Sequence, residues 1–378
     1  TSFTDTGTGE TLDGTMTGSS SFYNLIFNGS GGEWTPSAAV VVTNDLTMTA
    51  GSLLGAQNVT VNGNIACGAT CGAITTTGGT FTQRVNGSKN FGTSVAGATV
   101  WTFVNLTFSN STLATAVTIT TSTTGSGGIT ISGVLTVGSA GDTTKTTLNA
   151  GNRTWTLSNT DGADPFQLIA SPAGDLTPAT STFVYSGDNN VGSVTVQSET
   201  FCNLTVGNAV AGETYVLEAA TATDTAASCG NLTISSAAIS TNTLDVVNGS
   251  NYAVSIGGNY TNNGAFTARL GTVTLNGIGT QTLSGTMTSA SAFYDLAITN
   301  SSGAVSGCAT SFTPGVDFAT SATISNLYTI TTAGVKIEYN SGSTYAFNNM
   351  NWNGGGSSIY FRNSTLGIGT WLLNVTAV

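Results

Sequence analysis

Residues 11–17 read TLDGTMT and residues 22–25 read FYNL, and both runs return near the far end of the chain in the same register, as TLSGTMT at 282–288 and FYDL at 293–296. Weaker copies of the second run lie between them, at 103–106 and 201–204. A motif used four times indicates duplication, so the repeat has to be interpreted before any single residue. Repeats usually build a surface or a scaffold rather than one catalytic pocket.

The composition predicts an all-β protein. Of the 378 residues, 39% are hydrophobic and only 7% are charged, whereas charged residues make up about a quarter of an ordinary soluble domain. Thr, Ser, Asn and 49 Gly take their place. Thr and Val suit half-buried pleated surfaces, and Gly and Asn suit turns. No stretch has a 3.6-residue period long enough to predict a helix.

Short strands with period-2 alternation are separated by Gly, Asn and Ser turns along the whole chain. Landmarks such as Asn231-Leu232-Thr233 recur about every 15 to 30 residues inside the larger repeats, which is the length of a β-solenoid coil or of a hairpin in a sandwich, and the repeated Asn-Leu-Thr type favours stacked coils. We therefore predict a parallel β-helix of about four degenerate repeats that form one continuous body. The expected repeats are 1–80, 81–182, 183–265 and 266–378, the last with a C-terminal strand.

Tandem β-sandwich domains are the alternative architecture, because a repeat of about 80 to 100 residues also has the length of an immunoglobulin-like domain. Against it, no linker is visible, the chain has only 5 Pro, and no Cys…Trp…Cys signature occurs. In either case we expect the Phe residues at the equivalent motif positions to lie in the core. These are Phe22, Phe103, Phe201 and Phe293.

The charge content argues against several classes of function. Net charge is −11, with 7 Lys and Arg and no His. Without a basic patch we expect neither nucleic-acid binding nor docking on anionic lipid, and no apolar run approaches the roughly 20 residues of a membrane span. Without His, neither a Ser-His-Asp nor a Cys-His arrangement is available. The acidic residues are scattered, so we expect no enzyme and no cofactor.

Asp161 and Asp164, in the run 159–164, form the best calcium-loop candidate. The run offers oxygen ligands and a Gly for the turn, but it lacks the full Asp-x-Asn-x-Asp-Gly pattern and its distant Glu. A bare surface turn is therefore the favoured interpretation, and we predict no metal site.

Cysteine positions predict two disulfides. Cys67 and Cys71 bracket a short loop, and Cys202 and Cys229 each lie just before an Asn-Leu motif. If those motifs stack on adjacent strands, a separation of about 4.8 Å falls within disulfide range. Cys308 is left over, and five buried thiols are the alternative interpretation.

Several features together predict an extracellular protein. The chain starts at Thr1 with no signal peptide, so we expect a processed, mature segment. Asn-x-Ser/Thr sequons are dense, and the loop sites Asn28, Asn86, Asn248 and Asn300 are the favoured glycosylation candidates. Low charge and disulfides fit the same location.

The runs 22–27, 231–234 and 255–264 resemble secreted, repeat-rich β-helical surface proteins of bacteria and archaea, adhesin-like proteins among them. The closing segment 361–376 is similar to a segment of the same kind of protein. The resemblance touches most of the chain. It implies an adhesive or filament-forming role at the cell surface, and it transfers no catalytic residue.

The ends of the chain lead to the functional prediction. Residues 370–378 form an uncharged strand pattern in which Trp371, Leu372, Leu373 and Val375 are the candidate assembly residues. An open β-stack pairs through its terminal edges unless they are capped, and neither end has an obvious cap. We predict a structural subunit of a cell-surface filament or sheath that joins copies of itself through exposed β edges or a donated terminal strand. Uncapped ends are equally expected of a chain cut from a longer surface protein.

An adhesin stalk or a carbohydrate-binding surface module is the alternative function. Its partners would be glycans or other cells. Trp34, Trp101 and Trp352 would stack on sugar rings if they shared one exposed face.

Overall fold

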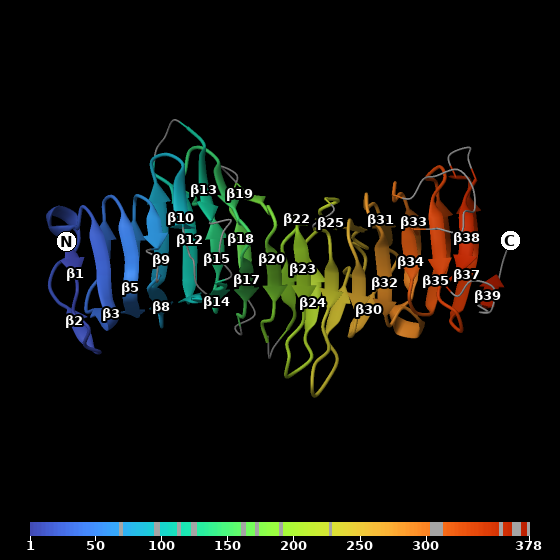
Figure 1. The fold of residues 1–378 in the computed structure, drawn as a ribbon, viewed down its shortest axis with the longest axis horizontal. Coiled ribbons are helices and arrows are strands. Elements are labelled where there is room, and N and C mark those ends of the chain that lie inside the picture. The colour runs from blue at the N-terminus through green and yellow to red at the C-terminus, as the bar shows by residue number, and fades with distance from the viewer. Residues whose placement is uncertain are drawn as a thin grey trace. The chain divides into compact units, whose positions relative to one another are not determined.

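The computed structural model describes residues 1–67, 71–93, 99–111, 115–121, 127–159, 164–170, 174–188, 192–226, 229–302, 313–354, 358–364 and 372–375. The chain forms two compact units, Thr1–Asn190 and Val191–Val378. Each unit is a stack of successive coils (Figure 1). Every coil contributes short strands that pair in parallel with the equivalent strands of the neighbouring coils.

The strands of the first unit form three parallel stacks, two of which are joined because the long strands β3 and β5 run through both. The first stack contains β1 (Ser2–Phe3), β3 (Leu25–Pro36), β5 (Leu46–Gly55), β7 (Ile65–Cys67), β10 (Lys89–Thr93), β13 (Val117–Thr121), β16 (Thr146–Asn149) and β19 (Gly174–Thr177). The second contains β2 (Glu10–Leu12), the second halves of β3 and β5, β8 (Ala73–Thr76), β11 (Trp101–Phe103), β14 (Ile129–Ile131), β17 (Thr154–Leu157) and β20 (Thr182–Tyr185). The third contains β4 (Val40–Val42), β6 (Val59–Val61), β9 (Thr80–Val85), β12 (Asn105–Asn110), β15 (Leu135–Val137) and β18 (Phe166–Leu168).

The second unit repeats this arrangement with its own three stacks. One contains β21 (Val194–Val196), β24 (Thr214–Leu217), β27 (Thr243–Asp245) and β30 (Ala265–Thr267). The next contains β22 (Thr200–Phe201), β25 (Thr221–Thr223), β28 (Val254–Ile256), β31 (Thr272–Leu275), β33 (Phe293–Ile298), β35 (Ala322–Ile330), β37 (Thr344–Trp352) and β39 (Leu372–Val375). The last contains β23 (Asn203–Val206), β26 (Leu232–Ile234), β29 (Tyr260–Asn262), β32 (Gln281–Gly285), β34 (Val316–Phe318), β36 (Lys336–Tyr339) and β38 (Tyr360–Asn363).

The register gives the length of a coil. Leu46 pairs with Ile65, 19 residues later, and Ile119 pairs with Leu148, 29 residues later. The predicted parallel β-helix is therefore confirmed, and the sandwich alternative is wrong, because sandwiches are built from antiparallel sheets. Each predicted repeat contains several coils. The division into four repeats stays a prediction.

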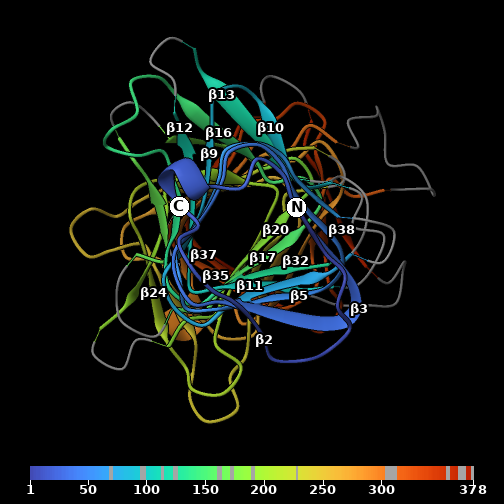
Figure 2. The same cartoon turned by 90° about the vertical axis from the view of Figure 1, so that its left-hand side faces the viewer.

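Alternation along each strand separates an inner from an outer row of side chains. In the third stack of the first unit the inner row is fully buried, and it runs Val40, Val59, Phe81, Leu106, Leu135, Phe166. The outer row of the same strands carries Thr60, Thr82, Thr107 and Thr136. Figure 2 views the first unit from its N-terminal end, where the coils of β2, β3 and β5 surround the interior that these apolar side chains fill. Period-2 patterning in coils of constant register thus produces one continuous core per unit.

Candidate functional site

The two copies of the sequence repeat, 11–25 and 282–296, fold in the same way. Each contains one short 3-10 turn between two strands, Gly18–Ser20 in the first copy and Ser289–Ser291 in the second. The preceding Thr17 and Thr288 have nearly equal dihedral angles, with φ of −131° and −128°. Gly14 and Gly285 lie in the left-handed region, with φ of 102° and 87°, a conformation that glycine adopts without steric cost.

Asn24 and Asp295, the residues that differ in FYNL and FYDL, make equivalent hydrogen bonds. Asn24 Oδ1 accepts the backbone N–H of Asp45 (3.1 Å) and the amide N–H of Asn44 (2.9 Å). Asp295 Oδ1 accepts the backbone N–H of Leu327 (3.1 Å) and the amide N–H of Asn326 (2.7 Å). In both copies one side-chain oxygen thus holds the next coil in place, which explains why either Asn or Asp serves there.

The second copy is covered by the coil that precedes it; we call the side of a coil that faces preceding residues its lower side. Leu283 pairs with Tyr260 below it, and Leu296 pairs with Val273. The Ser291 hydroxyl accepts the backbone N–H of Phe266 at 3.1 Å. The lower side of the second copy is therefore an internal contact of the β-helix.

The lower side of the first copy is open. β2 pairs with β3 on one side, and among the described residues no strand pairs on its other side. β1 pairs with the first half of β3, Ser2 lying opposite Ile26 and Phe3 opposite Phe27, and it does not pair with β2. We call the lower side of residues 10–22 the open edge.

The exposure of matched residues confirms this difference between the copies. Ser20 and Phe22 are exposed and half-buried, whereas their counterparts Ser291 and Phe293 are buried. A Cβ placed on Gly285 would lie 2.1 Å from the carbonyl oxygen of Asn262 in the coil below, but a Cβ on Gly14 would meet no atom within 4 Å. The open edge thus has the shape of an internal coil contact, and no coil of the described residues covers it.

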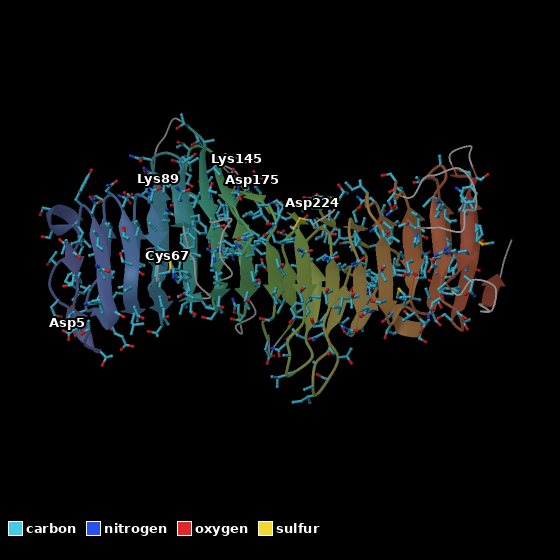
Figure 3. All side chains as sticks on the ribbon, viewed as in Figure 1. Asp5, Cys67, Lys89, Lys145, Asp175 and Asp224 are labelled. Carbon is cyan, nitrogen blue, oxygen red and sulfur yellow. A yellow bond between two sulfur atoms is a disulfide. The ribbon has the colours of Figure 1, made fainter. Side chains whose placement is uncertain are left out.

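Charge also distinguishes the open edge from its covered counterpart. Exposed Glu10 replaces Gln281, which is fully buried, and exposed Asp13 replaces Ser284. Exposed Asp5 lies at the same end of the first unit (Figure 3). The first 83 residues contain five acidic residues and no Lys or Arg, so the open edge is acidic.

The last strands of the second unit carry a charged row on their outer face. Asp317, Glu338 and Arg362 lie opposite one another on β34, β36 and β38, and Arg362 forms an ion pair with Glu338. Burial and then the neighbouring charge of Glu338 raise the pKa of Asp317, although Arg362 acts in the opposite direction. No described strand pairs on the far side of β38, so Arg362 lies at a sheet edge.

The predicted assembly strand is present, but it is not free. Leu372, Leu373 and Val375 belong to β39, which pairs in parallel with β37, Thr344 lying opposite Leu372. Trp371 lies outside the described residues.

Both predicted disulfides are present. Cys67 and Cys71 are joined, with Cα atoms 4.6 Å apart, and Cys202 is joined to Cys229, with Cα atoms 4.8 Å apart. The second bridge links two successive coils, as the matching Asn-Leu motifs predicted. Cys308 lies outside the described residues.

The same motifs form a ladder of asparagines beside the second disulfide. Asn203 Oδ1 accepts the backbone and side-chain N–H groups of Asn231, at 3.1 and 3.0 Å. Asn231 Oδ1 accepts the backbone N–H of Asn259 (2.9 Å), and Asn259 Oδ1 accepts that of Thr282 (2.8 Å). The ladder ends on the second copy of the repeat.

The glycosylation candidates divide into two groups. Asn28, Asn86 and Asn248 are exposed. Asn300 differs from them, because its side chain is fully buried; glycosylation at all four sequons stays a prediction. The amide nitrogen of Asn300, the atom that would carry the sugar, donates to the carbonyl oxygen of Gly279 (2.9 Å) and to Oε1 of Gln281 (2.8 Å).

The remaining sequence candidates form no site in the described part of the chain. Asp161 lies outside it, and Asp164 is exposed. Among the described residues, no three acidic or cysteine side chains gather closely enough to bind a metal, and no helix has the length and hydropathy to cross a membrane. Trp34 and Trp101 are core residues, exposed by 1% and 3%. They therefore provide no platform for stacking on sugar rings.

Sequence reasoning missed the residues that distinguish the open edge, Glu10 and Asp13, and their basic counterpart Arg362. The available signal was the pair of differences between the copies, Gln281 against Glu10 and Ser284 against Asp13. No family model, curated protein or solved structure matches the chain.

Proposed function

We propose that this chain is a structural subunit of an extracellular filament or sheath, and that copies of it assemble through the exposed edges of the β-helix. One observation carries the proposal. The open edge at 10–22 repeats a sequence that is covered by another coil where it occurs inside the second unit. A parallel strand edge with unpaired backbone groups is a template for pairing with another chain.

The chemistry of the surface supports the same function. Only 7% of the residues are charged, and the outer rows are rich in Thr, so contacts between subunits bury few charges. The net charge of −11 repels copies of the chain, but physiological salt screens this repulsion beyond about 8 Å. Two disulfides support the extracellular location, where such bonds persist. The buried inner rows and the hydrogen-bonded Asn ladder stiffen the body that the edges connect.

Negative-stain electron microscopy of the purified chain over a range of concentrations tests the proposal. We expect fibres above a threshold concentration. Ser20→Arg should abolish them, because the covered counterpart Ser291 has no space for a larger side chain. Thr15→Arg is the matched control, since Thr286 stays exposed even in the covered copy.

Isolated monomers at every concentration would refute the proposal. If such monomers bound a defined sugar on a glycan array, the adhesin or carbohydrate-binding alternative would replace it. Equal loss of fibres in both Arg variants would show that the open edge is not the contact.

A further inference from the structure

We propose that the open edge of one molecule pairs with the β38 edge of another molecule of this chain. Subunits then join head to tail, with Thr11 of one molecule opposite Arg362 of the next. This inference rests on the proposed function and gives it a polarity, a register and named contacts. It follows from the position of the second copy of the repeat within its stack and from the charges at the two edges.

The register is taken from the second unit. β32, β34, β36 and β38 are successive strands of one stack, in which Thr282, Asp317, Glu338 and Arg362 lie opposite one another. Thr11 has the position in the first copy that Thr282 has in the second. A further coil added to this stack by the first copy therefore places Thr11 opposite Arg362.

The neighbouring pairs follow from the same register. The backbone N–H of Asn340 donates to the carbonyl oxygen of Phe318, and that of Ser364 donates to the carbonyl oxygen of Tyr339. The parallel register of β36 and β38 therefore continues by one residue, with Ser364 opposite Asn340. Asp13 is then opposite Ser364, and Asp13 and Thr11 both lie on the outer face, as Arg362 and Ser364 do. Asp13 is a diagonal neighbour of Arg362, within reach of a long side chain.

Charge selects this partner over a second open edge. In the register above, Asp13 lies on the outer face beside Arg362, whereas Glu10, at the position of the buried residue Gln281, lies opposite Phe361. An ionised carboxylate can only accept hydrogen bonds, so the outer face of the covering coil must present a donor to Asp13. Among residues 339–378 the only charged side chain is Arg362, a cation with five N–H donors.

The polarity follows as well. Two open edges brought together would place Glu10 and Asp13 of one copy against those of the other, and like charges in opposition disfavour that contact. A head-to-tail contact uses two different surfaces and does not close on itself by a twofold axis. Such contacts build open filaments when the rotation between neighbours does not close into a ring, and the microscopy described above distinguishes fibres from rings.

Cysteine cross-linking of the full-length chain tests the register. Asp13→Cys and Ser364→Cys are made separately in a Cys308→Ser background and mixed under oxidising conditions. Adjacent strands lie about 4.8 Å apart, within disulfide range, so we expect a heterodimer on a non-reducing gel. Thr15→Cys mixed with Ser364→Cys is the matched control and should remain monomeric.

The outcomes separate this inference from the proposed function. Fibres without the expected cross-link would leave the function standing and overturn the register. A homodimer of Asp13→Cys alone would overturn the polarity, because it would show two open edges in contact.

Arg362→Gln tests the charge contribution. It should raise the concentration at which fibres appear by about 2- to 5-fold, the size expected for the loss of a partly exposed ion pair. Arg84→Gln, which changes an exposed residue of β9, is its control. An equal effect of both variants would contradict the role given to Arg362.

Discussion

The duplicated repeat allows one substitution to be tested in two environments within the same chain. Phe293 is fully buried, and its ring lies 5.5 Å from Tyr260 and 6.0 Å from Phe266, both in the coil below. Phe22, the matched residue of the first copy, is half-buried, and the ring nearest to it on the lower side is Phe3 at 6.4 Å. The two residues follow the same motif but differ in what lies beneath them.

The expected energies differ accordingly. Phe293→Ala removes a buried ring and leaves a cavity, so it should lower the free energy of unfolding by about 3–5 kcal/mol. Phe22→Ala removes a ring that is already partly in water. Complete burial of Phe is worth about 1.5–3 kcal/mol, so this variant should cost about 1 kcal/mol. Because both variants are Phe→Ala, their effects on the unfolded chain are closely matched.

Urea unfolding followed by circular dichroism, at a concentration below the threshold for fibres, measures both free energies. If Phe22→Ala cost as much as Phe293→Ala under these conditions, the reasoning would be refuted, because the lower side of the first copy would then be covered in the monomer. Above the threshold, Phe22→Ala should also weaken assembly, since a partner coil covers that ring in the proposed fibre.

Three further predictions concern contacts between coils. Asn231→Ala should lower the free energy of unfolding by about 1–3 kcal/mol, because it leaves ladder N–H and carbonyl groups without partners; an unchanged urea midpoint would count against the ladder. Replacing Cys202 and Cys229 together by Ala should cost about 3.5 kcal/mol, the value expected for opening a loop with a sequence separation of 27, and an effect below about 1 kcal/mol would contradict this. Because the folded chain raises the pKa of Asp317, ionisation of this carboxyl costs stability at neutral pH, and the cost disappears as the pH falls below its ordinary value of about 4. Asp317→Asn should therefore stabilise the chain by about 0.2–1 kcal/mol at pH 7 and by nothing at pH 3, whereas destabilisation at pH 7 would show that burial and the repulsion from Glu338 do not outweigh the attraction to Arg362.

Much of the fold could be predicted because a β-helix repeats its chemistry along the sequence. The Asn-Leu-Thr motif at 203–205 and 231–233 predicted stacked coils, and the structure pairs Leu204 with Leu232. The same spacing predicted the disulfide between Cys202 and Cys229. Both predictions succeeded because parallel strands in constant register place identical motif positions next to each other.

Predictions failed where a residue's environment depends on another coil. Phe22 and Phe293 belong to the same motif, but the sequence does not state which of them has a coil beneath it. Asn300 lies in a sequon and reads as a loop residue, but its amide binds Gln281 and Gly279 inside the turn. Trp34 and Trp101 look irregular in the sequence, yet both pack in the core. Burial at these positions is a long-range property, and the local pattern does not encode it.

The side-chain ladders have a direction that bears on how the chain folds. In each ladder the acceptor belongs to the earlier coil and the donor to the later one: Asn24 accepts from Asp45, Asp45 from Asn64, and Asn64 from Asn90. The same order holds from Asn203 to Thr282. Each coil of these two ladders thus presents an oriented oxygen to residues that follow it by about 20 to 30 positions, a separation short enough for rapid loop closure. A chain that is synthesised from its N-terminus can fold one coil at a time, because each folded coil is the template for the next. Little apolar surface then stays exposed while the rest of the chain is made.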